Sequence, residues 1–242
     1  MSQPQSNRAL RLGLIGGCGC ALLSIIAVAV IVLVIVMGGG DSTPTTEPED
    51  DTAAGELVAP PGVGADQPYL ELSTSSDGPE VDVYIDFLCP HCATFHDAQG
   101  EDLAQLAEEA AITLRIHPRP MLDASSTPEG YSGRAANAAV CAYAEGDGSA
   151  ENWFAAEQVL FENQPGAEGI EDGELVSLVD GAAGTDIADC VADSTYLPWI
   201  QDVVEPEAQG AVPGTPAVLI DGAAFEGDPA EAGSVRAAIE AA

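Results

Sequence analysis

Hydrophobic residues dominate positions 12–37, a stretch of Ile, Val, Leu and Ala that contains no charged residue. As a helix, these roughly 26 residues would be about 39 Å long at ~1.5 Å per residue, which is enough to cross a hydrocarbon layer of about 30 Å with some tilt. Arg8 and Arg11 precede the stretch and acidic residues follow it, so the positive-inside rule places residues 1–11 in the cytoplasm. The pattern predicts a single-pass transmembrane helix in the cell membrane, with the rest of the chain extracytoplasmic.

A cleaved signal peptide is the competing interpretation of this stretch. A signal peptide has a shorter hydrophobic region and ends in a small-x-small cleavage site, whereas this stretch is long and ends in Met37-Gly38-Gly39-Gly40. We therefore favour an uncleaved anchor. Cys18 and Cys20 lie toward the start of the stretch and not after it, which argues against a lipoprotein signal; inert thiols and acylated thiols both stay open for this pair.

Residues 38–68 have the composition of a linker. They are rich in Pro, Thr, Gly, Asp and Glu and show no apolar periodicity, so we predict a flexible acidic tether. A coil of about 30 residues spans roughly 30 Å. Such a tether would keep a following domain near the membrane surface.

The pattern changes after the linker, where short runs rich in β-branched and aromatic residues begin. The runs 69–72, 81–88 and 112–117 are strand-like, and apolar residues with helical spacing fill 91–110 between the last two. A strand, a helix and a second strand in this order predict a right-handed parallel unit.

The next segment, 121–210, has no strong strand pattern. Its Ala-rich parts have helical spacing, and they lie around 131–145, 150–163, 173–182 and 186–205. This segment is therefore predicted to be a block of helices.

Strand-forming sequence returns near the C-terminus. Residues 217–220 are strand-like, Asp221-Gly222 is a hairpin-turn signal, and 231–241 has the pattern of a closing helix. Because sheet-forming segments lie on both sides of the helical block, we predict one α/β domain made of 69–120 and 211–242, with 121–210 as a helical insertion.

Composition adds a strong constraint on partners. The 242 residues include 40 acidic and only 6 basic residues, all of them Arg, and the formal net charge is −34. Nucleic acid is not an expected partner, because phosphate groups need cationic side chains. The acidic surface and the single anchor favour a soluble, monomeric outer domain.

The candidate chemistry lies at Cys89-Pro90-His91-Cys92, where a predicted strand gives way to a predicted helix. Unpaired amides and the helix dipole at that point favour a thiolate and lower the pKa of Cys89. Cys92 can reach Cys89 within one helical turn, so Cys89 is the expected exposed nucleophile and Cys92 the more buried resolving thiol of an exchange through mixed disulfides. His91 can add a hydrogen bond or positive charge that favours the reduced form, and the alternative is a solvated surface residue.

Four groups of residues follow one another in a defined order along the chain. They are Asp86-Phe87-Leu88-Cys89-Pro90-His91-Cys92, Arg134-Ala135-Ala136-Asn137-Ala138-Ala139-Val140-Cys141-Ala142, Asn152-Trp153-Phe154 with Leu160-Phe161-Glu162-Asn163-Gln164, and Val212-Pro213-Gly214-Thr215-Pro216-Ala217. With these groups in this order, residues 69–242 resemble the DsbA-type family of thioredoxin-like disulfide oxidoreductases. The resemblance implies a thioredoxin-like α/β fold with an inserted helical domain, and chemistry that needs no cofactor.

The resemblance also assigns roles outside the cysteine motif. It implies that Pro216 is a cis-proline facing the two cysteines and that Thr215 offers its backbone to an extended substrate; a plain turn is the alternative. Some members carry a second, structural disulfide in the helical block, which here would join Cys141 to Cys190. An outward-facing compartment permits that bond, and two buried free thiols are the alternative.

We therefore predict a protein thiol–disulfide oxidoreductase of the oxidase type, which introduces disulfides into unfolded or reduced exported proteins. The resemblance alone implies a membrane quinone-linked partner that reoxidises the active-site pair. A reductase or isomerase with the same site is one alternative, and a non-catalytic binding or chaperone module is another.

Several other titratable residues near the motif are candidates of lower rank. His96, with the motif itself, loosely suggests zinc, but no distant second pair of ligands is evident, so no metal is expected. Asp82 and Asp86 are the acids nearest the motif in sequence; either could assist proton transfer, although capping or solvation is the simpler role. His117 ends a predicted strand and is expected to be structural.

Overall fold

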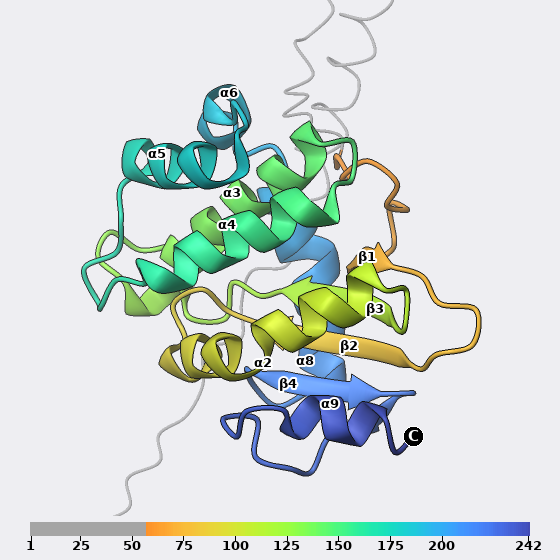
Figure 1. The fold of residues 1–242 in the computed structure, drawn as a ribbon. Coiled ribbons are helices and arrows are strands. Elements are labelled where there is room, and N and C mark those ends of the chain that lie inside the picture. Colours follow the sequence, from red (N-terminus) through yellow and green to blue (C-terminus); the bar gives the residue numbers. More distant parts are fainter. Residues whose placement is uncertain (1–56) are drawn as a thin grey trace, which may run out of the picture. The chain divides into compact units, whose positions relative to one another are not determined.

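The computed structural model describes residues 57–242 (Figure 1). The predicted cytoplasmic segment 1–11, the transmembrane helix 12–37 and the first part of the tether lie outside the described residues. Within 57–242, no helix combines the length and the hydrophobicity needed to cross a membrane. Residues 57–68, which the sequence analysis assigns to the tether, contain turns and irregular structure, and Leu57 and Val63 pack against the core of the domain.

A five-stranded sheet with the order β1-β3-β2-β4-β5 forms the centre of the domain. The strands are β1 (Leu70–Ser73), β2 (Glu80–Ile85), β3 (Thr113–Pro118), β4 (Ala217–Ile220) and β5 (Ala223–Ala224). β2 pairs in parallel with β3, which confirms the parallel unit, while β1, β4 and β5 run antiparallel to their neighbours. At the centre, Val83 is opposite Ile116 on one side and Val218 on the other.

Two helices belong to the same part of the chain as the strands. α2 (Pro90–Glu108) connects β2 to β3, and α9 (Ser234–Ile239) closes the chain and packs against α2. The buried side chains of α2 recur at helical spacing and include Phe95, Leu103 and Leu106. This apolar stripe fixes the helix on the sheet, so that its first turn lies at the carboxyl end of β2.

The remaining helices come between β3 and β4, as an insertion. They are the 3₁₀ turn η1 (Asp123–Ser125), α3 (Tyr131–Glu145), α4 (Ala150–Glu162), α5 (Asp172–Ala183), α6 (Ala188–Ala192), α7 (Leu197–Trp199), the π-helix η2 (Ile200–Val204) and α8 (Glu205–Ala211). Figure 1 shows α3 to α6 gathered at one end of the sheet, away from β4 and α9. α3 is buried along almost its whole length, so it forms the centre of the insertion.

The predicted helical segment 186–205 is divided in the structure. α6 ends at Ala192, and a second helical run begins at Leu197 and continues through η2 and α8. Ser194 in the break has φ 51°, a left-handed conformation that a continuing helix does not permit. Pro198 lies in the first turn of the second run, where its missing N–H leaves no intrahelical bond unmade.

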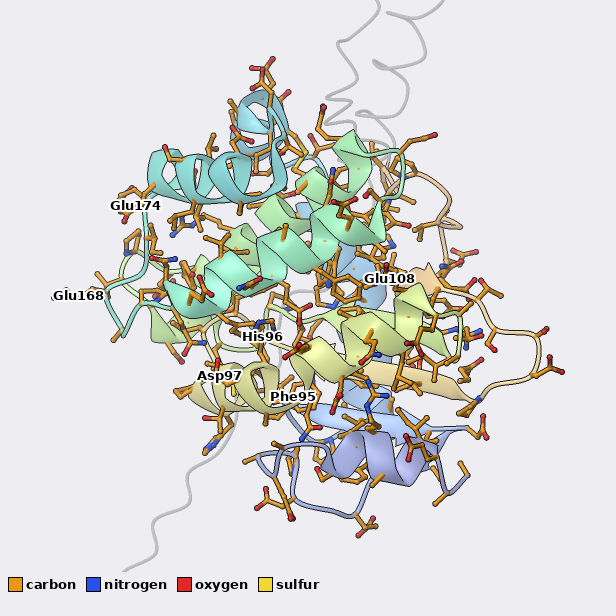
Figure 2. All side chains as sticks on the ribbon, viewed as in Figure 1. Phe95, His96, Asp97, Glu108, Glu168 and Glu174 are labelled. Atoms are coloured by element: carbon orange, nitrogen blue, oxygen red, sulfur yellow. A yellow bond between two sulfur atoms is a disulfide. The ribbon has the colours of Figure 1, made fainter. Side chains whose placement is uncertain are left out.

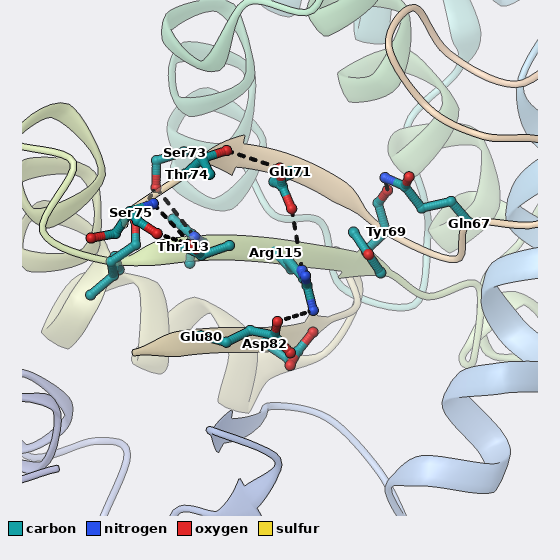
Figure 3. Close-up of polar contacts among 12 residues, drawn as sticks. Gln67, Tyr69, Glu71, Ser73, Thr74, Ser75, Glu80, Asp82, Thr113 and Arg115 are labelled. Carbon is teal, nitrogen blue, oxygen red and sulfur yellow. Dashed lines mark hydrogen bonds and ion pairs between the residues drawn. The ribbon is translucent and has the colours of Figure 1, made fainter. Parts of the chain in front are cut away.

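Few cations are available to this acidic domain, and each described arginine pairs with an acid (Figure 3 shows one case). Arg115 on β3 contacts Glu71 of β1 and Glu80 of β2, and its guanidinium lies 4.5 Å from the Tyr69 ring centre. The other pairs are Arg119–Glu205, Arg134–Asp172 and Arg236–Asp102. All of these pairs join segments distant in sequence.

Cys141 on α3 and Cys190 on α6 are joined by a disulfide, with their Cα atoms 6.0 Å apart. The pairing is the one that the family resemblance implies. It closes a loop with a sequence separation of 49 residues inside the insertion.

Removing this disulfide is expected to destabilise the domain. In the chain-entropy description, a crosslink across a loop of about 50 residues stabilises the fold by about 4 kcal/mol, because it restricts the unfolded chain. The double variant Cys141→Ala/Cys190→Ala should therefore lose most of that free energy of unfolding in urea titrations at neutral pH. An unfolding midpoint equal to that of the unsubstituted chain would contradict the structural role.

Candidate active site

Cys89 lies where the chain passes from β2 into α2. A tight turn connects the two, closed by a hydrogen bond of 3.1 Å from the Cys89 N–H to the Asp86 carbonyl. Cys89 itself is the N-cap residue of α2, and Pro90 occupies the first turn, where proline is well tolerated. The Cys89 carbonyl accepts hydrogen bonds from the N–H groups of Cys92 and Ala93, which begin the helix. The motif therefore lies at the junction of a strand and a helix, as predicted.

The surroundings of the Cys89 sulfur favour its ionised form. The pKa of Cys89 is lowered from 9.0 to about 5, chiefly by the hydrogen bond with the Cys92 thiol. Burial acts in the opposite direction, while the Thr215 side chain and the backbone amides of Cys92 and His91 lower the pKa further. Cys89 is buried, with 5% of its surface exposed, so the prediction of an exposed nucleophile is wrong. Cys89 is a thiolate at neutral pH, which is the nucleophilic form of a cysteine.

Cys92 has the opposite environment. Its side chain is 0% exposed, and the backbone N–H of Asp86 donates to its sulfur over 3.4 Å. Burial is the main cause that raises the pKa of Cys92 above its ordinary value, and the hydrogen bond to Cys89 adds to the rise. Both cysteines are free thiols in the structure, with no disulfide between them. The pair thus consists of one ionised sulfur in a slightly exposed residue and one protonated sulfur in a fully buried residue.

Thr215 and Pro216 come to the same place from the other end of the sequence. The peptide bond between them is cis, and the Thr215 carbonyl lies 3.5 Å from the Cys89 sulfur. The structure therefore brings together the cysteine pair and the loop that the sequence analysis joined to it by resemblance.

Pro90 and His91, the two residues between the cysteines, are exposed. Among residues 57–242, no hydrogen bond or ion pair to the His91 imidazole occurs. The contribution of His91 to the pKa of Cys89 comes through its backbone amide. The ring itself is open to solvent at the rim of the site.

Asp86 is a buried carboxyl directly below the motif. It is 0% exposed and accepts hydrogen bonds from the Leu88 N–H, the Leu122 N–H and the Ser132 hydroxyl, over 2.8, 2.9 and 2.7 Å. Burial raises the pKa of Asp86 to about 6, against the lowering effect of these hydrogen bonds, and the charge of Cys89 raises it further. Asp86 therefore organises the turn and titrates near pH 6 beside the thiolate.

Gln164 is a site residue that the sequence analysis quoted only as part of a motif. It follows α4, and its side-chain amide donates to the carbonyls of Phe87 and Cys89, over 2.9 and 3.1 Å. Ser132 on α3, which none of the quoted motifs contains, is a second site residue, because its hydroxyl donates to Asp86. Only their presence in or near family motifs could have pointed to them, because local sequence patterns do not encode such distant contacts.

The other titratable candidates, His96, Asp82 and His117, contact side chains of the surrounding fold and not the cysteine pair. His96 lies on α2 toward α4 (Figure 2), with its ring 3.7 Å from the Glu157 carboxylate and packed on Phe161. Burial lowers the pKa of His96, but the interaction with the nearby Glu157 carboxylate outweighs burial, and the net shift is upward. The side chains of Asp82 and His117 are hydrogen-bonded to each other over 2.9 Å, and neither is among the causes of the lowered pKa of Cys89.

An ionised sulfur that attacks and a buried neighbour that resolves are the two parts of thiol–disulfide exchange. The class of protein that the fold and this site define is therefore the thiol–disulfide oxidoreductases. Residues 75–241 match the model of a family described as thioredoxin. The chain belongs to the DsbA-like, thioredoxin-fold family of disulfide oxidoreductases.

Solved structures agree with this assignment. The reduced disulfide bond oxidoreductase DsbG from Mycobacterium tuberculosis is 27% identical, with a TM-score of 0.59 over 74% of this chain and 89% of that chain. Reduced DsbA from the same organism is 26% identical, with a TM-score of 0.59 over 72% and 91%. The thiol-disulfide oxidoreductase MdbA from Corynebacterium diphtheriae, 16% identical with a TM-score of 0.56 over 67% and 90%, shares the fold. No curated protein was found to match.

The comparisons confirm two predictions. The α/β thioredoxin-like fold with an inserted helical region is correct. The enzyme class, thiol–disulfide oxidoreductase, is also correct.

Proposed function

We propose that this protein is a dithiol oxidase that introduces disulfides into reduced, exported proteins through Cys89 and Cys92. The observation that carries the proposal is the stabilised Cys89 thiolate, with its pKa near 5. An enzyme whose reduced form is stabilised gives its disulfide away readily and is therefore a strong oxidant.

The reaction begins with Cys89 and Cys92 joined by a disulfide. A substrate thiolate attacks the Cys89 sulfur, the bond between Cys89 and Cys92 breaks, and the departing Cys92 sulfur takes up a proton. A second substrate thiolate then attacks the substrate sulfur of the mixed disulfide, and Cys89 leaves as a thiolate. The substrate loses two electrons and the enzyme gains them, and Cys89 is a favourable leaving group because its pKa is low.

Substrate binding in this proposal uses the main chain of the cis-proline loop. The Thr215 carbonyl is 3.5 Å from the Cys89 sulfur, so a peptide that pairs with Thr215 would place its cysteine next to the nucleophile. An extended, unfolded segment suits this mode, because its backbone groups are free to pair.

We place the domain outside the cell membrane, anchored by the helix predicted over 12–37. The bond between Cys141 and Cys190 supports an oxidising compartment, since such bonds are rare in the reducing cytosol. A membrane partner linked to quinone would reoxidise the pair after each turnover.

Titration of the full chain against glutathione buffers tests the direction of the reaction. We expect a reduction potential well above thioredoxin's, which is about −270 mV, and closer to the roughly −120 mV of a strong oxidant. The redox state can be read by trapping free thiols and resolving the products by mass. A potential as low as thioredoxin's would overturn the proposal and favour a reductase or isomerase with the same site.

A further inference from the structure

The end of α4 reaches the catalytic turn through one side chain. Gln164 directly follows this helix and its C-cap residue Asn163, and its own backbone N–H bonds to the Phe161 carbonyl over 3.1 Å. Its side-chain nitrogen lies 2.9 Å from the Phe87 carbonyl and 3.1 Å from the Cys89 carbonyl. An amide group has two N–H donors, and two carbonyl acceptors, on either side of Leu88, lie within their reach.

These two bonds define how the nucleophile is presented. The Cys89 carbonyl already accepts from the N–H groups of Cys92 and Ala93 at the start of α2. With Gln164 bound as well, the peptide plane that follows Cys89 is held from both the helix and the insertion. The direction of the Cys89 side chain depends on this plane. The Cys92 thiol, whose hydrogen bond is the main cause of the lowered pKa of Cys89, acts only over a short distance, and the Thr215 carbonyl lies 3.5 Å from the same sulfur.

We propose that Gln164 is a positioning residue for thiol–disulfide exchange, which fixes the Cys89 backbone so that its sulfur lies against Cys92 and Thr215. Gln164 touches no reacting atom and acts through the backbone of Cys89. The proposal rests on the exchange chemistry that defines the family and not on the oxidase direction proposed above. It makes the helical insertion a part of the active site.

The turn has a second support, which makes the role of the amide separable from folding. The Phe87 ring packs on Trp153 and Phe161, with ring centres 6.2 and 5.0 Å away, and is fully buried. This aromatic contact holds the turn in place when the amide is absent. A Gln164 variant should therefore fold, with the alignment of Cys89 as the property that changes.

Gln164→Met and Gln164→Glu test the proposal in the full chain. Methionine keeps the approximate length and removes both donors, while glutamate replaces them with acceptors that repel the two carbonyls. We expect the midpoint pH of Cys89 alkylation by iodoacetamide to rise by about one unit in Gln164→Met and by more in Gln164→Glu, because the thiolate loses well-aligned donors. The rate of exchange with a reduced cysteine-containing peptide should fall about tenfold.

Asn163→Asp is the matched control. It adds the same charge as Gln164→Glu one residue earlier, at an exposed side chain whose amide bonds only to Val159 in its own helix. We expect its alkylation midpoint and exchange rate to stay within about twofold of the unsubstituted protein. The proposal is overturned if Gln164→Met keeps both properties unchanged, or if Asn163→Asp changes them as much as Gln164→Glu does. Neither outcome depends on the reduction potential that tests the oxidase proposal.

Discussion

Replacing Cys89 with Ser is expected to reduce thiol–disulfide exchange by at least about 10³-fold, because the hydroxyl is not ionised at neutral pH and cannot form a mixed disulfide. The reaction of the oxidised full chain with a reduced peptide, followed by mass spectrometry, measures the loss. The buried Cys92 cannot replace the nucleophile, since it is 0% exposed and its pKa is raised.

Two further variants make this result specific. Cys92→Ser keeps the nucleophile and removes the resolving thiol. With a disulfide-containing peptide as substrate, Cys89 attacks one sulfur, the other leaves as a thiolate, and the mixed disulfide on Cys89 should accumulate. Cys18→Ser/Cys20→Ser removes the other unassigned thiols of the sequence and should leave the rate unchanged. Substantial exchange by Cys89→Ser would mean that a different cysteine carries the chemistry.

The second large effect is the pH at which Cys89 ionises. Its alkylation rate should reach half of its maximum near pH 5, about four units below the ordinary value of 9.0. The Cys92 hydrogen bond is the main cause, so Cys92→Ala should move the midpoint upward. Stopped reactions with iodoacetamide between pH 3 and 10 give the profile. A midpoint between 8 and 9 would show an unactivated thiol.

The same ionisation links stability to redox state. The folded pKa of Cys89 lies below its unfolded value, so the contribution is fully present above pH 9 and is lost as the pH falls toward 5. At pH 7 it amounts to about 2–3 kcal/mol in favour of the reduced fold. The free energy of unfolding of the reduced protein, minus that of the oxidised protein, should therefore rise between pH 5 and 9. A difference that does not vary with pH would contradict the assignment.

The ionisation of Asp86 changes stability with pH in the opposite direction to that of Cys89. For this reason we compare the difference in the free energy of unfolding between the reduced and the oxidised protein. The folded pKa of Asp86, about 6, lies above its ordinary value of 3.8, so its contribution is present below pH 3.8 and is lost as the pH rises through 6. Because Asp86 belongs to both redox forms, most of its effect cancels when the two curves are subtracted.

The sequence predicted the local architecture of the site well, for a physical reason. β2 carries β-branched and aromatic residues at strand-like spacing and Pro90 suits the first turn of a helix, so the strand-to-helix junction at Cys89 follows from neighbours in the chain. The order of sheet segments around a helical block followed from the same periodicities. The break in 186–205 was missed, because Ser194 gives no strong turn signal in a helical context.

The contacts that hold the site together were beyond such patterns. Gln164 and Cys89 are 75 residues apart, and Ser132 and Asp86 are 46 residues apart. Hydrophobic periodicity specifies which face of a helix is buried, but not which polar atom at its end meets a distant carbonyl. The packing of Leu57 and Val63 against the core was missed likewise, since isolated apolar residues in a Pro- and Gly-rich stretch carry no periodic signal.

The opposite pKa shifts of the two thiols, together with the full burial of Cys92, determine where a covalent adduct can form. An incoming molecule meets only Cys89, and the 0% exposed Cys92 is kept for an attack from within the protein. The lifetime of a mixed disulfide on Cys89 is therefore set by attack from Cys92, whose effective concentration next to Cys89 does not depend on the surrounding medium. A substrate that reacts slowly or fits poorly is released when Cys92 attacks the mixed disulfide. The active site is therefore not blocked by its own intermediates.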